Sequence, residues 1–453
     1  MAHSALPSLQ FENTRRQIIR MTLPISMAIF IPQLNFVINN IFLGHYLKDS
    51  MALAVAGITG VYYLIFAAIG YGLNNGLQTL IARRAGENRP EEIGKLFSQG
   101  VWIGLALAAV GIATTYVLTP YIFSLILRDQ IVLQKALGFL QIRIWGLLFL
   151  YVYLLRNALL VGTNQSRYLV AGTLAETLSN ILFDYLFIFG AGGFPELGFE
   201  GAAYASVLSE FIGMFVIYAV IRYKGIAKRF QLFTDFSFSA VNNKLILSVS
   251  APLMFQHAIS IISWQYFFLL IEHHGAMAMK VSNIMRNIFG LFGCFSWAFA
   301  ATTNAMVSNL IGQGKQEEVV PLIKKIIQLS AGSILIIAIL LNIFPEPFIA
   351  LFGQDQAFTV EALPVLRVVT LALLMMSFST VMINTVTASG NTRVTFYIEA
   401  MAILFYCAYV YVTCEYFFLP ITYGWMSEWL YWICLFAPSF LYVKSGRWKN
   451  KKI

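Results

Sequence analysis

Charged residues are scarce in this chain of 453 residues: Asp, Glu, Lys and Arg make up 11% of it, whereas hydrophobic residues make up 59%. Water-soluble domains typically carry about 25% charged residues, so the composition excludes a soluble globule. A helix that crosses the membrane uses about 20 apolar residues, and a dozen such helices would leave no room for a sizeable soluble domain. The function must therefore be performed inside the membrane.

The chain also lacks the residue patterns of several enzyme and binding classes. Its four cysteines lie in apolar runs without the spacing of a metal or redox site. The stretch Gly312–Lys315 (GQGK) lacks the spacing of a phosphate-binding loop, and no nucleophile–base signature is present. We therefore expect neither an enzyme nor a resident cofactor. The net charge of +9 is expected to reflect membrane orientation and not nucleic-acid binding.

Apolar runs between charged, glycine and proline breaks predict an all-α membrane protein with twelve spanning helices. The predicted spans are 18–43, 52–82, 96–118, 140–161, 168–189, 201–221, 245–271, 281–311, 326–343, 368–388, 394–416 and 425–443. An even number of crossings places both termini on one side of the membrane. That side holds 22 of the 30 Lys and Arg residues and the other side 7, Arg143 among them, so the positive-inside rule predicts cytoplasmic termini.

The sequence repeats itself at a spacing of about 226 residues. The landmarks are Pro24 with Pro252, Gly86–Ile93 with Gly312–Val319, and Asn164–Arg167 with Gly390–Arg393. Because each half has six helices, an even number, the two halves are predicted to be parallel bundles related by a pseudo-two-fold axis along the membrane normal. We expect lobes at 1–221 and 245–453, joined by a basic cytoplasmic linker at 222–244. This is an architecture of transporters that rock around a central cavity.

Several stretches at these landmarks resemble the multidrug and toxic compound extrusion (MATE) family. They are Leu23–Ile25, Gln78–Ala82, Asn180–Gly190 (NILFDYLFIFG) and Phe194–Ala203 (FPELGFEGAA). The resemblance covers nearly the whole chain. It implies two lobes in a V around a cavity, in a monomeric multi-pass protein of the bacterial inner membrane. It also implies a secondary active antiporter that exports amphipathic or cationic organic compounds in exchange for H⁺ or Na⁺.

A flippase for lipid-linked oligosaccharides or precursors is the alternative function, because its helical plan is related. Such a protein would be expected to have a strongly cationic central cavity. Arginines are few within the predicted spans, namely Arg20, Arg143, Arg156 and Arg286, and each lies within five residues of a span end. The paucity of intramembrane cations therefore favours the antiporter.

Four acidic residues lie deep inside the predicted spans: Glu176, Asp184, Glu210 and Glu399. A charged group at the bilayer centre costs about 2.5–3.5 kcal/mol, so each is a functional candidate. Glu176, Asn180 and Asp184 are spaced four apart and therefore form one stripe on the fifth span. Asp184 lies five residues from the outer end, roughly 8 Å at 1.5 Å per residue. At that depth it can receive H⁺, or Na⁺ among other oxygen ligands.

The resemblance to the MATE family implies that Asn180 and Asp184 belong to a cation site in the amino-terminal lobe. Members that use this site carry an Asp fifteen residues after the helix 1 proline, and here that position is Asn39. An asparagine can bind Na⁺ through its carbonyl but cannot take up a proton. Asp184 is thus expected to be the principal titrating group, with Ser206 in the position of a family hydroxyl and no metal site beyond this one.

The carboxy-terminal half is poorer in intramembrane acids, and its candidates are polar. Gln256 and His257 on the seventh span, together with Glu210, form a candidate secondary site; a histidine titrates near neutral pH, but packing is the alternative role for His257. Glu399 lies near a helix end and is expected to be structural. Pro24 and Pro32 are the predicted hinge of the first helix, since prolines kink helices.

Overall fold

The computed structural model describes residues 8–46, 50–127, 129–232, 234, 237–350, 356–451 and 453. The side chains of 36–46, 50–54, 350, 356, 357 and 450 lie outside the description. Within these ranges the chain forms helices and no β-strand. The structure is therefore all-α, as the composition predicts.

Twelve long helices account for most of the described chain when the bent pair α5 and α6 is taken as one span. The first half contains α1 (Arg15–Tyr46), α2 (Ser50–Gly86), α3 (Pro90–Val117), α5 (Gln130–Arg143) with α6 (Gly146–Gly162), α7 (Leu169–Phe189) and α8 (Gly198–Tyr223). The second half contains α10 (Ala240–Glu272), α11 (Ala276–Gly312), α12 (Val319–Ile343), α14 (Gln356–Ala388), α15 (Thr392–Val410) and α17 (Ser427–Lys444). Short helices connect them: α4 (Thr119–Ile126), α9 (Ile226–Arg229), α13 (Pro345–Ala350) and α16 (Ile421–Trp425).

The predicted spans recur as helices, but most helices are longer than the apolar runs. Hydropathy marks only the part of a helix inside the hydrocarbon, whereas the hydrogen-bonded turns continue into the polar interface. The fourth span differs most, because it begins at Gln130 rather than near 140 and bends by 45° between α5 and α6. By length and hydropathy nine single helices and this bent pair qualify as spans within the described residues. Polar residues dilute the other two, α7 and α17.

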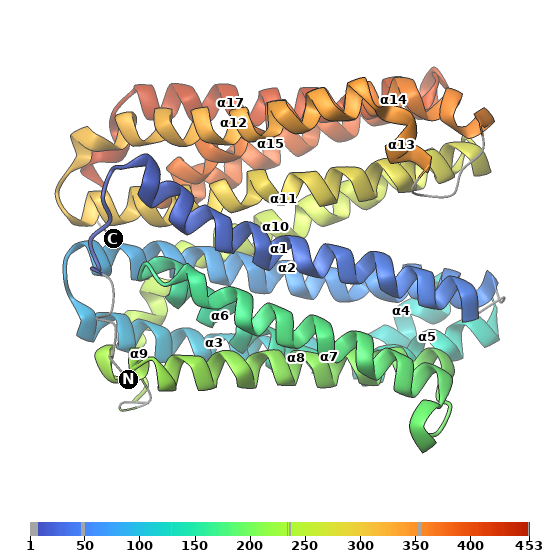
Figure 1. Cartoon of the computed structure of the whole chain (residues 1–453), viewed down its shortest axis with the longest axis horizontal. Coiled ribbons are helices and arrows are strands. Elements are labelled where there is room, and N and C mark those ends of the chain that lie inside the picture. Colours follow the sequence, from blue (N-terminus) through green and yellow to red (C-terminus); the bar gives the residue numbers. More distant parts are fainter. Residues whose placement is uncertain are drawn as a thin grey trace.

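The long helices run side by side along the long axis of the molecule (Figure 1). Helices α3 and α5–α9 lie in the lower part of the view and α12–α17 in the upper part, with α1 and α2 between them next to α10 and α11. The amino-terminal end of α1 and the carboxy-terminus lie at the same end of the bundle, below called the terminal end. This placement agrees with an even number of crossings.

The two halves meet closely where the last turns of α2 and α11 pack together, Asn75–Gly86 against Ala301–Gly312, here called the α2–α11 seam. Gln78 Nε2 donates to the carbonyl of Ala301 at 2.9 Å. Asn304, which lies 226 residues after Gln78, donates from Nδ2 to the carbonyl of Asn75 at 3.2 Å. The internal repeat relates the donors Gln78 and Asn304 and also the acceptors Asn75 and Ala301, so each hydrogen bond is the symmetry counterpart of the other. The pseudo-two-fold axis therefore passes through the seam.

A second exchanged pair of hydrogen bonds lies one turn closer to the terminal end. Arg83 Nε donates to the carbonyl of Ser308 at 3.1 Å, and Asn309 Nδ2 donates to the carbonyl of Ala82 at 3.0 Å. Both side chains are buried. Buried polar groups are costly unless they are hydrogen-bonded, so the seam is stable only while the two helices stay in register.

Two glycines, again 226 residues apart, allow the helix backbones to touch. A Cβ on Gly86 would lie 2.1 Å from the carbonyl oxygen of Asn309, and a Cβ on Gly312 would lie 2.3 Å from that of Arg83. No side chain fits in either position. One apolar core continues across this contact and includes Leu77 and Leu310, so the bundle is closed at its terminal end.

A short amino-terminal segment covers the seam. Leu9 and Phe11 are buried, at 4% and 2% exposure. The Phe11 N–H donates to Asn309 Oδ1 at 3.0 Å, and Asn309 Nδ2 donates to the carbonyl of Leu9 at 2.9 Å. Gln10 Nε2 donates to the carbonyl of Gly86 at 3.1 Å. The segment therefore holds α2 and α11 at the same time.

Replacing Gly86 by alanine should lower the unfolding temperature, because the added Cβ overlaps the main chain of α11. Overpacking of this kind costs about 1–3 kcal/mol, and intrinsic tryptophan fluorescence of the purified protein during heating measures the change. The control is Gly332→Ala in α12, where a Cβ meets nothing within 4 Å and alanine is favoured by roughly 0.5–1 kcal/mol. Equal unfolding temperatures in the two variants would contradict the close contact.

Candidate functional site

Asp184 lies on the buried side of α7, where the sequence places the central acid. Its exposure is 2%, and neither carboxylate oxygen has a hydrogen-bond partner among the described residues. The opposite side of α7 carries exposed apolar residues, including Leu178 and Leu182, and is the side that suits lipid. Asp184 is therefore a buried acid that faces protein and is not capped by an arginine.

Asn180, one turn from Asp184, joins α7 to α1. It is buried at 4% exposure, and its Oδ1 accepts a hydrogen bond from Asn35 Nδ2 at 2.7 Å. Sequence reasoning missed Asn35, although it lies one turn before the predicted ligand Asn39. The Asn39 side chain itself is outside the described residues. The hydrogen bond between Asn35 and Asn180 thus places amide oxygens and N–H groups within one helical turn of the buried Asp184 carboxylate.

Glu176 and Ser206 lie where α7 packs against α8. A Cβ on Gly213 would lie 2.8 Å from Glu176 Cβ, so Glu176 is directed at α8. Nearer the other end of this helix pair, Gly201 contacts the main chain of Phe187 in the same way. Ser206 falls between these two contacts, at the level of Asn180 and Asp184, and is half-buried. No hydrogen bond joins its hydroxyl to Asp184 among the described contacts.

Glu210 forms an ion pair within the first half. Both of its oxygens accept hydrogen bonds from Arg143, at 2.9 and 2.7 Å, and Tyr63 donates to it at 3.1 Å. The Arg143 guanidinium also stacks 3.6 Å from the centre of the Tyr63 ring. The bend after α5 brings Arg143 into the bundle, whereas the sequence analysis placed it at the outer face. The structure thus separates Glu210 from Gln256 and His257.

Gln256 instead belongs to a polar cluster around Glu399 in the second half. Glu399 is 3% exposed and accepts hydrogen bonds from Gln256 Nε2 at 3.2 Å and Ser260 Oγ at 2.8 Å. The Tyr431 hydroxyl donates to it as well. The position of Glu399 near the end of α15 predicts a side chain that reaches the membrane interface, but its carboxylate points into the protein. The only sequence signal for this cluster is the one-turn spacing of Gln256 and Ser260.

His257 connects the two halves. Its Nε2 lies 3.3 Å from Asn75 Nδ2 on α2, and its Nδ1 lies 2.8 Å from the carbonyl of Leu253. A proton assigned to Nδ1 satisfies both contacts, since Nε2 then accepts from the amide. The neutral imidazole is therefore fully hydrogen-bonded as an interface residue.

The predicted hinge prolines lie within an unbroken helix. Both Pro24 and Pro32 fall inside α1, which runs continuously from Arg15 to Tyr46. Beside Pro24, the Thr22 hydroxyl is 2.9 Å from the Thr302 hydroxyl of α11. This contact ties α1 to the second half, and the hinge stays a prediction.

Replacing Arg143 or Glu210 singly by methionine should destabilise the protein strongly, because each change leaves the other charge buried and unpaired. Losses of about 3–5 kcal/mol are typical for a broken buried pair, and the double variant should recover most of them. A double-mutant cycle on unfolding temperatures measures the coupling. Lys449→Gln is the control, since its pair with Glu317 is exposed and worth about 0–1 kcal/mol. Additive losses at Arg143 and Glu210 would refute the pair.

Comparisons with known proteins agree with this arrangement. The MatE family model matches residues 24–186 and again 252–412, so each half matches once, at the spacing of the internal repeat. A probable multidrug resistance protein NorM of Thermotoga maritima is 23% identical, covering 99% of this chain and 96% of the relative. The multidrug resistance protein MdtK of Photorhabdus laumondii is 26% identical over 66% of this chain and 65% of its own.

Two solved structures share the fold. One is an outward-facing multidrug resistance MATE family transporter, with a TM-score of 0.88 and 17% identity, covering 99% of this chain and 100% of its own. The other is a transporter of the MOP superfamily from Pyrococcus furiosus, with a TM-score of 0.87 and 16% identity, covering 99% of this chain and 100% of its own. Since the family model spans both halves of the chain, this protein belongs to the MATE family of membrane transporters.

Proposed function

We propose that the protein is a secondary active antiporter that exports amphipathic or cationic organic compounds in exchange for H⁺ or Na⁺. The observation that carries the proposal is the state of Asp184, a buried carboxylate without a hydrogen bond or a cationic partner among the described residues. Glu210 and Glu399, by contrast, are satisfied by an arginine and by three neutral donors. Asp184 is thus a fully buried acid with free capacity to bind a cation.

Binding of a cation at Asp184 would change the energy of burying this side chain. An ionised carboxylate away from water is costly unless it is paired, and a proton or Na⁺ removes that cost. Occupancy and solvent exposure of the site are therefore linked. The Asn180–Asn35 hydrogen bond, one turn away, connects the site to α1, and α1 in turn contacts α11 through Thr22 and Thr302.

Alternating access would proceed by opening the α2–α11 seam while the opposite end closes, with residues 1–221 and 245–453 moving as lobes about the linker. Each intramolecular hydrogen bond contributes about 0.5–1.5 kcal/mol net. One elementary charge crossing 100 mV supplies about 2.3 kcal/mol, enough to sustain roughly a 50-fold gradient of a neutral drug. The energy that one charge supplies is thus of the same order as the energy of the seam's hydrogen bonds, as reversible opening of the seam requires.

Two observations favour drug export over the flippase. The curated relatives are multidrug resistance proteins by name, which supports small organic substrates. The basic side chains that enter the first half are already engaged: Arg143 by Glu210, and Arg156 by the carbonyl of Met214. Arg143 is thus neutralised, and Arg156 alone does not form a cationic wall for a lipid headgroup.

Replacing Asp184 by asparagine should abolish cation-coupled efflux, because an amide cannot exchange a proton and carries no charge to balance Na⁺. Without one coupled charge the sustained gradient of a neutral dye should fall by about 50-fold. Everted membrane vesicles loaded under separately imposed H⁺ and Na⁺ gradients measure the dye transport. The gradient that drives efflux in the wild type identifies the coupling ion.

The control for this experiment is Glu196→Gln, an exposed acid in the loop after α7, which should transport like the wild type. Expression and unfolding temperature of the Asp184→Asn variant are compared in the same preparations. A well-expressed Asp184→Asn variant that sustains the wild-type dye gradient would show that Asp184 is not the coupling residue.

The proposed orientation places both termini in the cytoplasm, since the terminal end carries most of the Lys and Arg residues. A green fluorescent protein fused after Ile453 should therefore fluoresce, and an alkaline phosphatase fused there should be inactive. The opposite pattern would invert the topology and the direction of transport.

A further inference from the structure

A groove opens between α10 and α15 at the terminal end of the second half. It consists of two hollows of about 370 and 260 Å³ that share Ser248 and Arg393. The first hollow runs along α10 past Pro252 to Phe255, and the second extends to the residues just before α15 and to the carboxy-terminal tail. The groove plays no part in the proposed cation site, which lies in the other half.

The walls of the groove are apolar and exposed. Phe255 is 65% exposed and Tyr397 67% exposed. On α10, the exposed residues Ile262 and Leu269 follow Phe255 at seven-residue spacing, so they continue the same face away from the terminal end. An uncovered apolar stripe along a membrane helix is the surface that lies against lipid chains.

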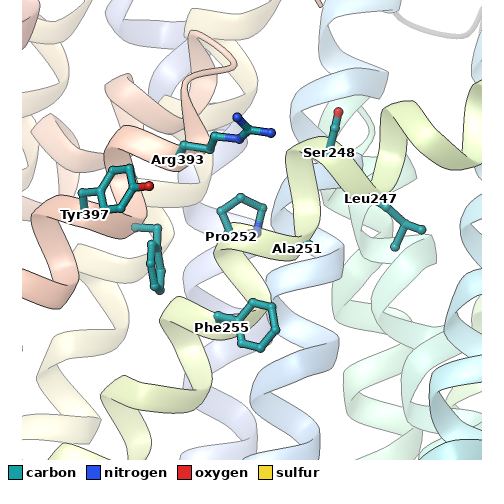
Figure 2. A pocket seen from close by; sticks show the side chains of 8 residues that line it. Leu247, Ser248, Ala251, Pro252, Phe255, Arg393 and Tyr397 are labelled. Atoms are coloured by element: carbon teal, nitrogen blue, oxygen red, sulfur yellow. The ribbon is translucent and has the colours of Figure 1, made fainter.

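Positive charge is concentrated at the rim of this groove. Figure 2 shows the Arg393 side chain extending from α15 across the groove toward α10, above Pro252, with Phe255 further along α10. Lys451 lines the second hollow. No acidic residue lines either hollow, and Arg393 forms no ion pair among the described residues. The first turn of α15 adds N–H groups without a side-chain cap, which favour an anion.

The corresponding position in the first half is occupied differently. Arg167 precedes Arg393 by 226 residues, and it donates to the Tyr168 hydroxyl at 2.7 Å and stacks 4.7 Å from the centre of that ring. The counterpart of Tyr168 is Val394, which has neither a hydroxyl nor a ring. Arg393 is therefore left without the internal partner that holds Arg167.

We propose that this groove binds one anionic phospholipid of the cytoplasmic leaflet, with its phosphate between Arg393 and Lys451 and an acyl chain along Pro252 and Phe255. Basic side chains at helix ends next to an apolar groove are the arrangement that recognises acidic lipid headgroups. The leaflet rests on the proposed orientation, whereas binding itself is independent of antiport. The acyl chain would lie against the apolar side chains of Pro252 and Phe255 on α10.

Native mass spectrometry of the purified full-length protein tests this proposal, with phosphatidylglycerol and phosphatidylcholine as probes at equal concentration. We expect wild-type protein to retain phosphatidylglycerol preferentially. Arg393→Gln and Lys451→Gln should each weaken retention by about fivefold, and the double variant by about 30-fold. The matched control is Arg167→Gln, which removes the same charge at the equivalent place and should bind like the wild type.

Two further measurements separate the lipid from other readings. Phosphatidylglycerol should raise the unfolding temperature of the wild type and not of the double variant, and inorganic phosphate should have no such effect. Equal lipid retention by Arg393→Gln and Arg167→Gln would overturn the site. Displacement of the lipid by millimolar phosphate would overturn the lipid as the occupant. Because none of these readouts involves transport, their failure would leave the antiport proposal standing.

Discussion

The contact between α2 and α11 is the constraint on which the rest of the structure depends. Its hydrogen bonds are exchanged in pairs by the internal repeat: Gln78 with Asn304, and Arg83 with Asn309. Glycines allow the two backbones to approach until no Cβ fits. A seam built in this way has one register, since a shift by one residue would leave several buried polar groups without partners. It fixes how the two halves face each other at the terminal end.

The intramembrane acids differ in what surrounds them, and this difference organises the proposed mechanism. Glu210 is neutralised by Arg143 at a helix bend, and Glu399 is held by neutral donors from α10 and α17. Asp184 has neither kind of partner among the described residues. A membrane protein can bury a fixed ion pair for stability, whereas an unpaired intramembrane acid is a candidate site for a mobile ion.

Much of the fold follows from the sequence, because the hydrophobic runs and the 226-residue spacing together predict the helix number and the parallel repeat. The four-residue spacing of Glu176, Asn180 and Asp184 predicts their common stripe on one helix. The partners of buried charges could not be predicted in the same way. Arg143 was assigned to the outer face because its helix begins ten residues earlier than its apolar run. Glu399 was judged by its depth along one helix, whereas its surroundings are set by residues 139 to 143 positions away on α10.

The amino-terminal segment gives the seam a further property. Leu9 and Phe11 are buried in a site formed jointly by both halves, and this site exists only while α2 and α11 are in contact. The segment is thus an intramolecular ligand of the conformation closed at this end, present at the high effective concentration of a short tether. A ligand that binds one state shifts the population toward it. In the proposed transport cycle, the balance between the two orientations would therefore be set in part by a few residues of this segment.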